Sequence, residues 1–184
     1  MMNNTDMYGR KSYFLKPADF YMTTEQMVIK TVLGSCVTLT MFSPQTGVSA
    51  ACHAVLPSCR DCSCPSDVCL NKYKFVKCVI PEMLKRFKKM GVDPGDIEIK
   101  MFGGADMIMV RKGSRSWDNQ RVGRQNIVMA RDVARENNLI IKKSDVGGTL
   151  GRKLYFDTES GEVWLKRLNR PVPNAGLLKQ TVTS

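Results

Sequence analysis

The sequence predicts a sheet-rich α/β fold, because many short strand patterns accompany only two helical ones. Segments that are rich in β-branched residues, or that alternate between apolar and polar residues, are predicted as strands at residues 19–22, 28–33, 37–42, 48–55, 97–102, 139–141, 153–156 and 162–168. Two segments, residues 73–90 and 127–137, carry apolar side chains at helical spacing. A chain of 184 residues, 43% of them hydrophobic, is long and apolar enough to form the core of one compact layered domain.

Glycine, proline and polar residues separate these elements. Residues 1–17 have a weak pattern and are predicted to be a flexible arm, whereas residues 18–168 are predicted to form the folded domain. Residues 43–47 and 157–161 are predicted to be the turns of two hairpins. Residues 57–72 are predicted to be a cysteine-rich loop inserted before the first helix.

The predicted helices have recognisable signals at their ends. Gly91 is expected to end the first helix, and Pro81 inside it to remove one backbone hydrogen bond and cause a kink. Asn126 is predicted to cap the second helix with its side chain. An exposed loop is expected at residues 113–119, and a mobile or surface-draped tail at residues 169–184.

His53 is the only histidine of the chain, so any chemistry that needs an imidazole has to use it. It lies in a predicted strand that follows strand 37–42 after a short turn. If the two strands form a hairpin with Phe42 near Val48, Cys36 comes to lie beside His53, because facing residues of antiparallel strands are about 5 Å apart. A thiol beside an imidazole is the arrangement of a cysteine nucleophile with its general base.

The residues before the cysteine support this hypothesis. Gly34 allows a sharp turn, which would hold the thiol clear of the sheet with the backbone N–H groups of Ser35 and Cys36 directed at one point. Thr31 could orient the imidazole through its hydroxyl group or its carbonyl oxygen. The alternative is a purely structural role, because free cysteine is often buried and a histidine in a strand is often a satisfied core residue.

Five blocks of sequence occur in a distinctive order. They are Thr31-Val-Leu-Gly-Ser-Cys36, His53-Ala-Val-Leu-Pro57, Lys100-Met-Phe-Gly-Gly-Ala105, Gly123-Arg-Gln-Asn126 and Asp145-Val-Gly-Gly-Thr-Leu-Gly-Arg152. In these blocks the chain closely resembles the CheD family, the chemoreceptor glutamine deamidases of chemotaxis. The resemblance extends from about residue 18 to residue 168.

The resemblance implies a three-layer α/β/β fold, with both helices on one side, and a hydrolase that needs no cofactor. Such an enzyme converts glutamines of methyl-accepting chemotaxis receptors to glutamate through a cysteine thioester, and it also binds the CheC phosphatase. Its catalytic residues would be Cys36, His53 and Thr31. Gly34 and Ser35 would lie at the oxyanion position, and a wall of the active site or a partner surface would be formed by Phe102, Gly103, Gly104 and Ala105.

Charge and composition set wider limits on function. No segment approaches the roughly 18 apolar residues of a membrane helix, and the polar first residues do not have the pattern of a signal peptide, so we expect a cytoplasmic protein without membrane insertion. The net charge of +11 would suit an acidic protein partner, an anionic membrane surface or nucleic acid. The basic residues are spread along the chain without a nucleic-acid motif, so nucleic-acid binding is not expected.

Four of the seven cysteines are clustered in the loop that follows His53, at Cys59, Cys62, Cys64 and Cys69. Four thiolates so close together could hold a zinc ion or an iron–sulfur cluster. The alternative is a polar loop of reduced thiols, because the spacing lacks the two separate CxxC pairs of a typical zinc site.

Two other classes of function stay open. One is a non-catalytic adaptor of the chemotaxis pathway that uses the same surface only to bind the phosphatase. The other is a metal- or redox-responsive regulator that depends on the loop from Cys59 to Cys69. The presence of Thr31, Cys36 and His53 together favours the enzyme, because an adaptor needs no thiol–imidazole pair.

Overall fold

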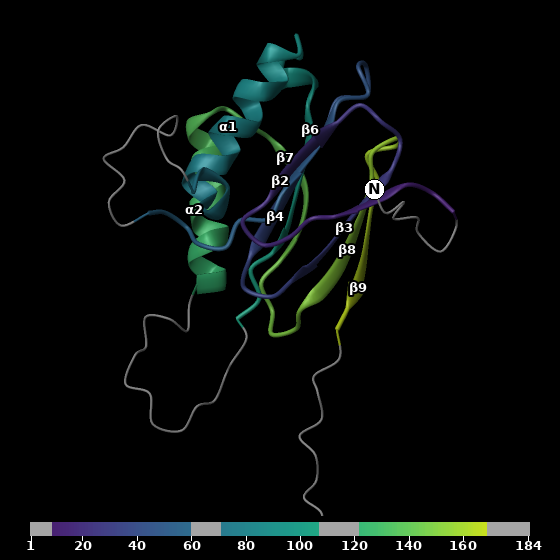
Figure 1. Ribbon diagram of the computed structural model, residues 1–184. Coiled ribbons are helices and arrows are strands. Elements are labelled where there is room, and N and C mark those ends of the chain that lie inside the picture. Colours follow the sequence, from purple (N-terminus) through teal and green to yellow (C-terminus); the bar gives the residue numbers. More distant parts are fainter. Residues whose placement is uncertain (1–8, 60–70, 107–121, 169–184) are drawn as a thin grey trace, which may run out of the picture.

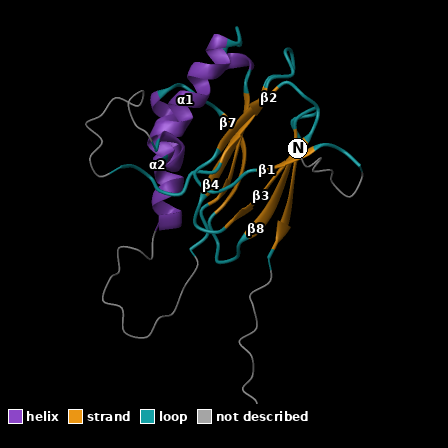
Figure 2. Ribbon diagram, in the orientation of Figure 1, coloured by secondary structure: helices purple, strands orange, loops and turns teal. Residues whose placement is uncertain are grey.

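The computed structural model of the chain describes residues 9–59, 71–106 and 122–168. In these residues two β-sheets pack face to face, and two helices cover the outer face of one sheet (Figure 1). The three layers therefore follow the order α/β/β, which Figure 2 shows as purple helices beside two orange sheets. The predicted α/β fold class is confirmed.

The five-stranded sheet forms the middle layer. Its strands lie in the order β2 (Phe20–Thr23), β5 (Ser49–Cys52), β4 (Val37–Phe42), β6 (Glu98–Gly103) and β7 (Ile141–Val146). Neighbouring strands are antiparallel except β6 and β7, which are parallel. All six residues of β4 are buried, because another layer covers each face of this central strand.

The four-stranded sheet forms the outer layer. Its strands lie in the order β1 (Ser12–Phe14), β3 (Val28–Leu33), β8 (Arg152–Asp157) and β9 (Val163–Arg167). Strand β1 runs parallel to β3, and the other two pairs are antiparallel. The hairpin of β8 and β9 agrees with the sequence prediction.

Two helices, α1 (Val76–Lys89) and α2 (Val122–Glu136), pack on the middle sheet, and short 3-10 turns occur at Lys72–Lys74 and Pro94–Asp96. Helix α1 runs through Pro81 as one element. No helix within the described residues is long and apolar enough to cross a membrane.

Side-chain alternation along β4 separates two hydrophobic cores. Val37, Leu39 and Met41 face the helices and pack with side chains such as Ile80 and Phe87 of α1. Phe42, at the end of the same strand, joins the second core, which fills the space between the two sheets. That second core also contains Ile29, Leu33, Phe102, Leu154 and Phe156. A polar residue on the inner face of either sheet therefore lies inside this inter-sheet layer.

The register of the predicted hairpin differs by one residue from the expectation. Phe42 pairs with Ser49 rather than with Val48, and the same register continues to an isolated bridge between Val37 and Ala54. His53 follows the last residue of β5 and, by continuation of this register, lies opposite Thr38. The prediction that Cys36 and His53 occupy neighbouring positions is thereby corrected. Cys36 is two residues before Thr38, so it lies on the same face of the sheet as Thr38 but not directly beside His53.

The prediction of a flexible arm was wrong for the residues just before position 18. Strand β1 pairs with β3, and Leu15 is fully buried between the sheets. The reason is that this short strand covers the edge of β3, a contact that a local pattern does not reveal. Residues 1–8 lie outside the described residues.

Two further element boundaries differ from the predictions. Helix α2 begins at Val122, so Asn126 is an interior residue of the helix and not its cap. Strand β7 extends to Val146, well beyond the predicted strand 139–141, because pairing with β6 continues into a segment that lacks an apolar pattern. The predicted loop at 113–119, the tail at 169–184 and most of the cysteine-rich loop lie outside the described residues.

Candidate active site

Thr31 and His53 meet in the layer between the two sheets. Thr31 comes from β3 of the four-stranded sheet, and His53 follows β5 of the five-stranded sheet. Both residues are buried, with 2% of each exposed. The Thr31 hydroxyl oxygen lies 2.8 Å from Nδ1 of His53 and 2.8 Å from the carbonyl oxygen of Leu15. The structure therefore places the predicted third residue in contact with the imidazole.

This geometry determines which imidazole nitrogen carries the proton. A hydroxyl group has one proton to donate, and the Leu15 carbonyl can only accept, so the Thr31 hydroxyl donates to Leu15. The same oxygen then accepts from Nδ1–H of His53. In the neutral ring Nε2 is consequently unprotonated, and this buried atom has no hydrogen-bond partner among the described residues. It is free to accept a proton from a thiol or a water molecule.

Cys36 lies immediately before β4, where the chain enters the middle sheet from the turn at Gly34-Ser35. Its thiol is half-buried against the inter-sheet core, the layer that also holds His53. The backbone of this turn is held from the end of β6: the Gly104 N–H donates to the Cys36 carbonyl at 2.8 Å, and the Ala105 N–H donates to the Gly34 carbonyl at 2.8 Å.

Residues 102–105, predicted as a wall of the active site or a partner surface, are all buried, so the prediction of a partner surface was wrong. They contact the nucleophile turn through their backbone. Gly103 has a φ of +108°, and a Cβ atom there would lie 2.2 Å from the carbonyl oxygen of Cys36. Only glycine allows this approach between β6 and the nucleophile turn. Ala105 is fully buried, and Phe102 packs in the inter-sheet core.

Asn126 is a residue whose contribution the sequence reasoning missed. Its side chain is completely buried, and its Nδ2 donates to the Ser35 carbonyl at 2.9 Å and to the Val55 carbonyl at 3.0 Å. It thus joins the turn that carries Cys36 to the segment that carries His53. The available signal was its place in the block Gly123-Arg-Gln-Asn126 that carries the family resemblance, whereas the local pattern around Asn126 favours a helix cap.

Arg152 supports the same region from β8. Its side chain is fully buried, and its guanidinium group donates to the carbonyl oxygens of Gly103, Asp145 and Gly147. It also forms an ion pair at 2.8 Å with the carboxylate of Asp145. Arg152 therefore connects the end of β6, which contacts Cys36, to the end of β7.

Burial shifts the pKa values of both candidate reacting groups toward their neutral forms. Desolvation lowers the pKa of His53, although the Leu15 carbonyl and the charge of Asp19 act in the opposite direction. Desolvation also raises the pKa of the Cys36 thiol, and the backbone N–H of Cys36 partly offsets this effect. The resting pair is therefore a neutral thiol and a neutral imidazole at neutral pH.

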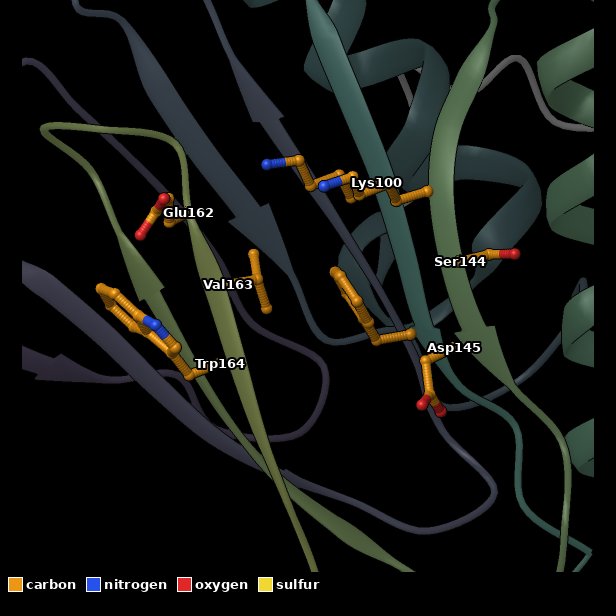
Figure 3. A pocket seen from close by; sticks show the side chains of 8 residues that line it. Lys100, Ser144, Asp145, Glu162, Val163 and Trp164 are labelled. Atoms are coloured by element: carbon orange, nitrogen blue, oxygen red, sulfur yellow. The ribbon is translucent and has the colours of Figure 1, made fainter.

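A pocket of about 370 Å³ has Phe102 among its lining residues (Figure 3). It lies between β7 and the β8–β9 hairpin, and Figure 3 shows Val163 pointing into it from β9, while Trp164 stands at its rim. Thr31, Cys36 and His53 do not line this pocket. Phe102 belongs both to the lining of this pocket and to the inter-sheet core.

The metal-site prediction falls mostly outside the described residues. Cys62, Cys64 and Cys69 are not described, and Cys59 is a half-buried free thiol. Within residues 9–59, 71–106 and 122–168, no group of three or more histidine, cysteine or acidic side chains could hold a metal ion. A metal site in the cysteine-rich loop stays a prediction.

Comparison with known proteins identifies the family. A family model described as "CheD chemotactic sensory transduction" matches residues 61–167. The chain is 41% identical over 157 residues to a probable chemoreceptor glutamine deamidase CheD 2 of Geobacter sulfurreducens, covering 85% of this chain and 90% of that protein. It is 34% identical over 157 residues to a probable chemoreceptor glutamine deamidase CheD of Maridesulfovibrio salexigens, covering 85% and 92%. The chain belongs to the CheD family.

The two kinds of comparison cover different parts of the chain. The family model begins after His53, whereas alignments that cover 85% of the chain necessarily include the segment with Thr31, Cys36 and His53. The family model therefore supports the family assignment without the candidate catalytic residues, and the alignments with the relatives include them.

Proposed function

We propose that this protein deamidates glutamine side chains of methyl-accepting chemotaxis receptors, with Cys36 as the nucleophile. The observation that carries the proposal is the hydrogen bond between Thr31 and Nδ1 of His53, because it leaves Nε2 unprotonated in the layer that holds the Cys36 thiol. The names of the CheD relatives, which are chemoreceptor glutamine deamidases, support the same activity.

The first half of the reaction forms a thioester. Nε2 of His53 removes the thiol proton as Cys36 attacks the carboxamide carbon of glutamine, and the carbonyl oxygen becomes an oxyanion. The backbone N–H groups of Ser35 and Cys36 stabilise that oxyanion. When the tetrahedral intermediate collapses, the C–N bond breaks and His53 returns the proton, so that ammonia leaves.

The second half restores the enzyme. His53 takes a proton from water, and the resulting hydroxide attacks the thioester carbon. The C–S bond then breaks, and His53 returns the proton to the departing Cys36 sulfur. The products are a glutamate side chain and the regenerated Cys36 thiol. Thr31 holds the ring through Nδ1 in both halves, which is the role of the third member of a catalytic triad.

The neutral state of the resting Cys36 and His53 side chains affects the timing of proton transfer in this mechanism. Because burial keeps the Cys36 thiol protonated and the imidazole uncharged, proton transfer accompanies attack on the substrate instead of preceding it. The free thiol is then less reactive toward unrelated electrophiles than a stable thiolate would be. Low reactivity of the free thiol suits an enzyme whose substrate is a particular glutamine on a protein surface.

The partner and the cysteine-rich loop belong to the proposal as well. We further propose that the protein binds the CheC phosphatase, as the family resemblance implies. The half-exposed nucleophile turn Gly34-Ser35-Cys36 is the expected contact, because residues 102–105 are buried. A zinc or iron–sulfur site at Cys59, Cys62, Cys64 and Cys69 would act on regulation, because the reaction steps use only protein groups and water.

Mass spectrometry of a purified receptor cytoplasmic fragment tests the activity. Incubation with wild-type protein should raise the mass of specific glutamine peptides by about 1 Da, because a carboxamide becomes a carboxylate. Cys36→Ala and His53→Gln should abolish this gain. Cys52→Ala is a matched control, since it removes a thiol that faces the helices instead of the inter-sheet layer. An unmodified receptor after incubation with wild-type protein would favour the adaptor role.

A further inference from the structure

All three carbonyl groups of the turn Gly34-Ser35-Cys36 are hydrogen-bonded to other parts of the protein. The first and the third accept backbone N–H groups from the end of β6. The middle carbonyl, that of Ser35, accepts instead from a side chain, the Nδ2 of Asn126 at 2.9 Å. The peptide group that precedes the candidate nucleophile is therefore oriented by one asparagine, 91 residues further along the chain.

The orientation of the Ser35 carbonyl determines the direction of a catalytic donor. The described residues contain no cis peptide bonds, and in a trans peptide the C=O of Ser35 and the N–H of Cys36 point in opposite directions. Because the carbonyl points toward Asn126 in α2, the Cys36 N–H points away from α2. That N–H acts on the Cys36 sulfur, where it partly offsets the effect of burial on the pKa of the thiol. This N–H is therefore next to the sulfur that would attack the reacting carbonyl carbon.

The second N–H of the same amide group reaches the segment of the base. Nδ2 also donates to the Val55 carbonyl at 3.0 Å, and Val55 lies two residues after His53. One fully buried NH₂ group therefore sets the position of the nucleophile turn and of the chain beside the imidazole. Serine or threonine has only one proton to donate, and an ionised aspartate has none, so only a primary amide of this length meets both carbonyls.

Close packing of α2 brings Asn126 to this position. Gly123 lies one turn before Asn126 on the same face of the helix, and a Cβ atom at Gly123 would lie 2.6 Å from the Gly104 carbonyl oxygen and 2.7 Å from that of Ala105. The absence of a side chain lets the helix backbone touch the segment that holds the nucleophile turn. The amide of Asn126 can then span the remaining distance.

We propose that Asn126 is a positioning residue of the deamidation reaction, which keeps the Cys36 N–H directed at the oxyanion. The inference rests on the proposed function, but its geometry concerns the free protein. Asn126 is 0% exposed and cannot contact a receptor, so its removal should alter turnover and not substrate binding. Loss of one oriented oxyanion donor typically lowers kcat about 10²-fold or more.

The test compares wild-type protein with Asn126→Leu, which has a similar shape and no donors, and with Asn137→Leu as the control. Asn137 also donates its Nδ2 to a backbone carbonyl, that of Val133 at 2.8 Å, but it is exposed and far from the turn along the helix. In deamidation of a receptor cytoplasmic fragment, Asn126→Leu should lower kcat about 10²-fold with KM nearly unchanged. Asn137→Leu should keep the wild-type kcat.

Alkylation of Cys36 by iodoacetamide distinguishes loss of an oriented oxyanion donor from a general disturbance of the structure. Alkylation needs an accessible thiol but forms no oxyanion, so in Asn126→Leu its rate should change much less than kcat. If alkylation and turnover fall together, in parallel with a lower unfolding temperature, Asn126 is merely structural and the proposal is overturned. An unchanged kcat in Asn126→Leu overturns it as well.

A further readout does not depend on turnover, so it keeps this inference distinct from the proposed function. In ¹H–¹⁵N NMR spectra of the free protein, the amide signal of Cys36 should move in Asn126→Leu and stay in place in Asn137→Leu. If wild-type protein proves inactive and the Cys36 signal moves, the proposed function fails while the positioning geometry stands. If the signal does not move, the positioning geometry is wrong whatever the activity.

Discussion

The hydroxyl oxygen of Thr31 lies 2.8 Å from Nδ1 of His53, and this contact joins the two sheets of the molecule. Thr31 belongs to β3 of the four-stranded sheet, His53 follows β5 of the five-stranded sheet, and both side chains are buried where they meet. Because the same hydroxyl group donates to the Leu15 carbonyl, the contact specifies the imidazole tautomer as well as its position. The candidate base is therefore prepared by the packing of the sheets.

Replacement of Thr31 should disable the base without removing it. Thr31→Val keeps the shape of the side chain but leaves Nδ1 of His53 and the Leu15 carbonyl without this partner. We expect kcat for receptor deamidation to fall about 10²- to 10⁴-fold, as when a triad loses the residue that holds its histidine. Thr31→Ser retains the hydroxyl group and should keep most of the activity. Equal activity of Thr31→Val and wild type would refute the orienting role.

The pH dependence of the reaction should reflect the buried imidazole. Burial lowers the pKa of His53, so the neutral, proton-accepting form persists below the ordinary value of about 6.5. We expect the acid limb of kcat/KM, which reports the free enzyme, to have its midpoint below pH 6.5. A pH profile of deamidation with the receptor fragment measures this midpoint. A midpoint above 6.5 would contradict a desolvated base.

The lowered pKa of His53 should also make the protein less stable in acid. The pKa of His53 is lower in the folded state than in the unfolded chain, so between these two values the unfolded chain binds more protons. The contribution of His53 to the free energy of unfolding is therefore complete above about pH 6.5 and falls as the pH decreases from there. Urea unfolding of wild type and His53→Gln should diverge in this direction, with a flatter pH dependence for the variant.

Gly103 should be irreplaceable because of its neighbour as well as its backbone angle. Gly103→Ala places a Cβ atom 2.2 Å from the Cys36 carbonyl oxygen, so the nucleophile turn has to move. We expect a loss of activity of about 10²-fold, the size of effect that a displacement near 1 Å produces. Gly91→Ala is the control, because Gly91 has a φ of +76° and open space around it. It should lose about 1–2 kcal/mol of stability and no activity.

Arg152 should contribute much more to stability than Arg167, although both pair with Asp145. Arg152 is fully buried and donates to three carbonyl groups, whereas the side chain of Arg167 is 51% exposed. Arg152→Met should lower the free energy of unfolding by about 3–5 kcal/mol, since buried acceptors and a carboxylate lose their partner. Arg167→Met should cost at most about 1 kcal/mol. Chemical denaturation of both variants gives the comparison, and equal costs would contradict it.

Metal removal should leave the chemical step intact. The proposed steps use the groups of Cys36, His53 and Thr31 with water, so protein treated with EDTA should deamidate the receptor fragment at the untreated rate. Elemental analysis of the untreated protein tests the cysteine-rich loop separately. A bound zinc ion together with unchanged activity after its removal would assign the loop a regulatory or structural role, whereas loss of activity would show that the site depends on it.

Much of the fold could be predicted because its elements have strong local patterns. Strands β3 and β4 occupy the predicted residues, and the amphipathic stripe of α1 faces the core as expected. Strand β1 was missed because three residues carry too little pattern, and its stability comes from pairing with β3. The start of α2 was misplaced because Asn126 has the local character of a cap and acts through contacts distant in sequence.

Local sequence patterns alone identify the residues that could perform the chemistry: the only histidine, a cysteine after a glycine turn and a threonine on the preceding strand. Tertiary structure decided how they are arranged, because Thr31 and His53 belong to different sheets that meet only when the inter-sheet core is packed. It also decided the role of Asn126, whose two hydrogen bonds span 91 and 71 residues. Periodicity and turn signals reflect interactions between near neighbours in the chain. The protonation, burial and orientation of a catalytic group depend on neighbours that only the folded chain supplies.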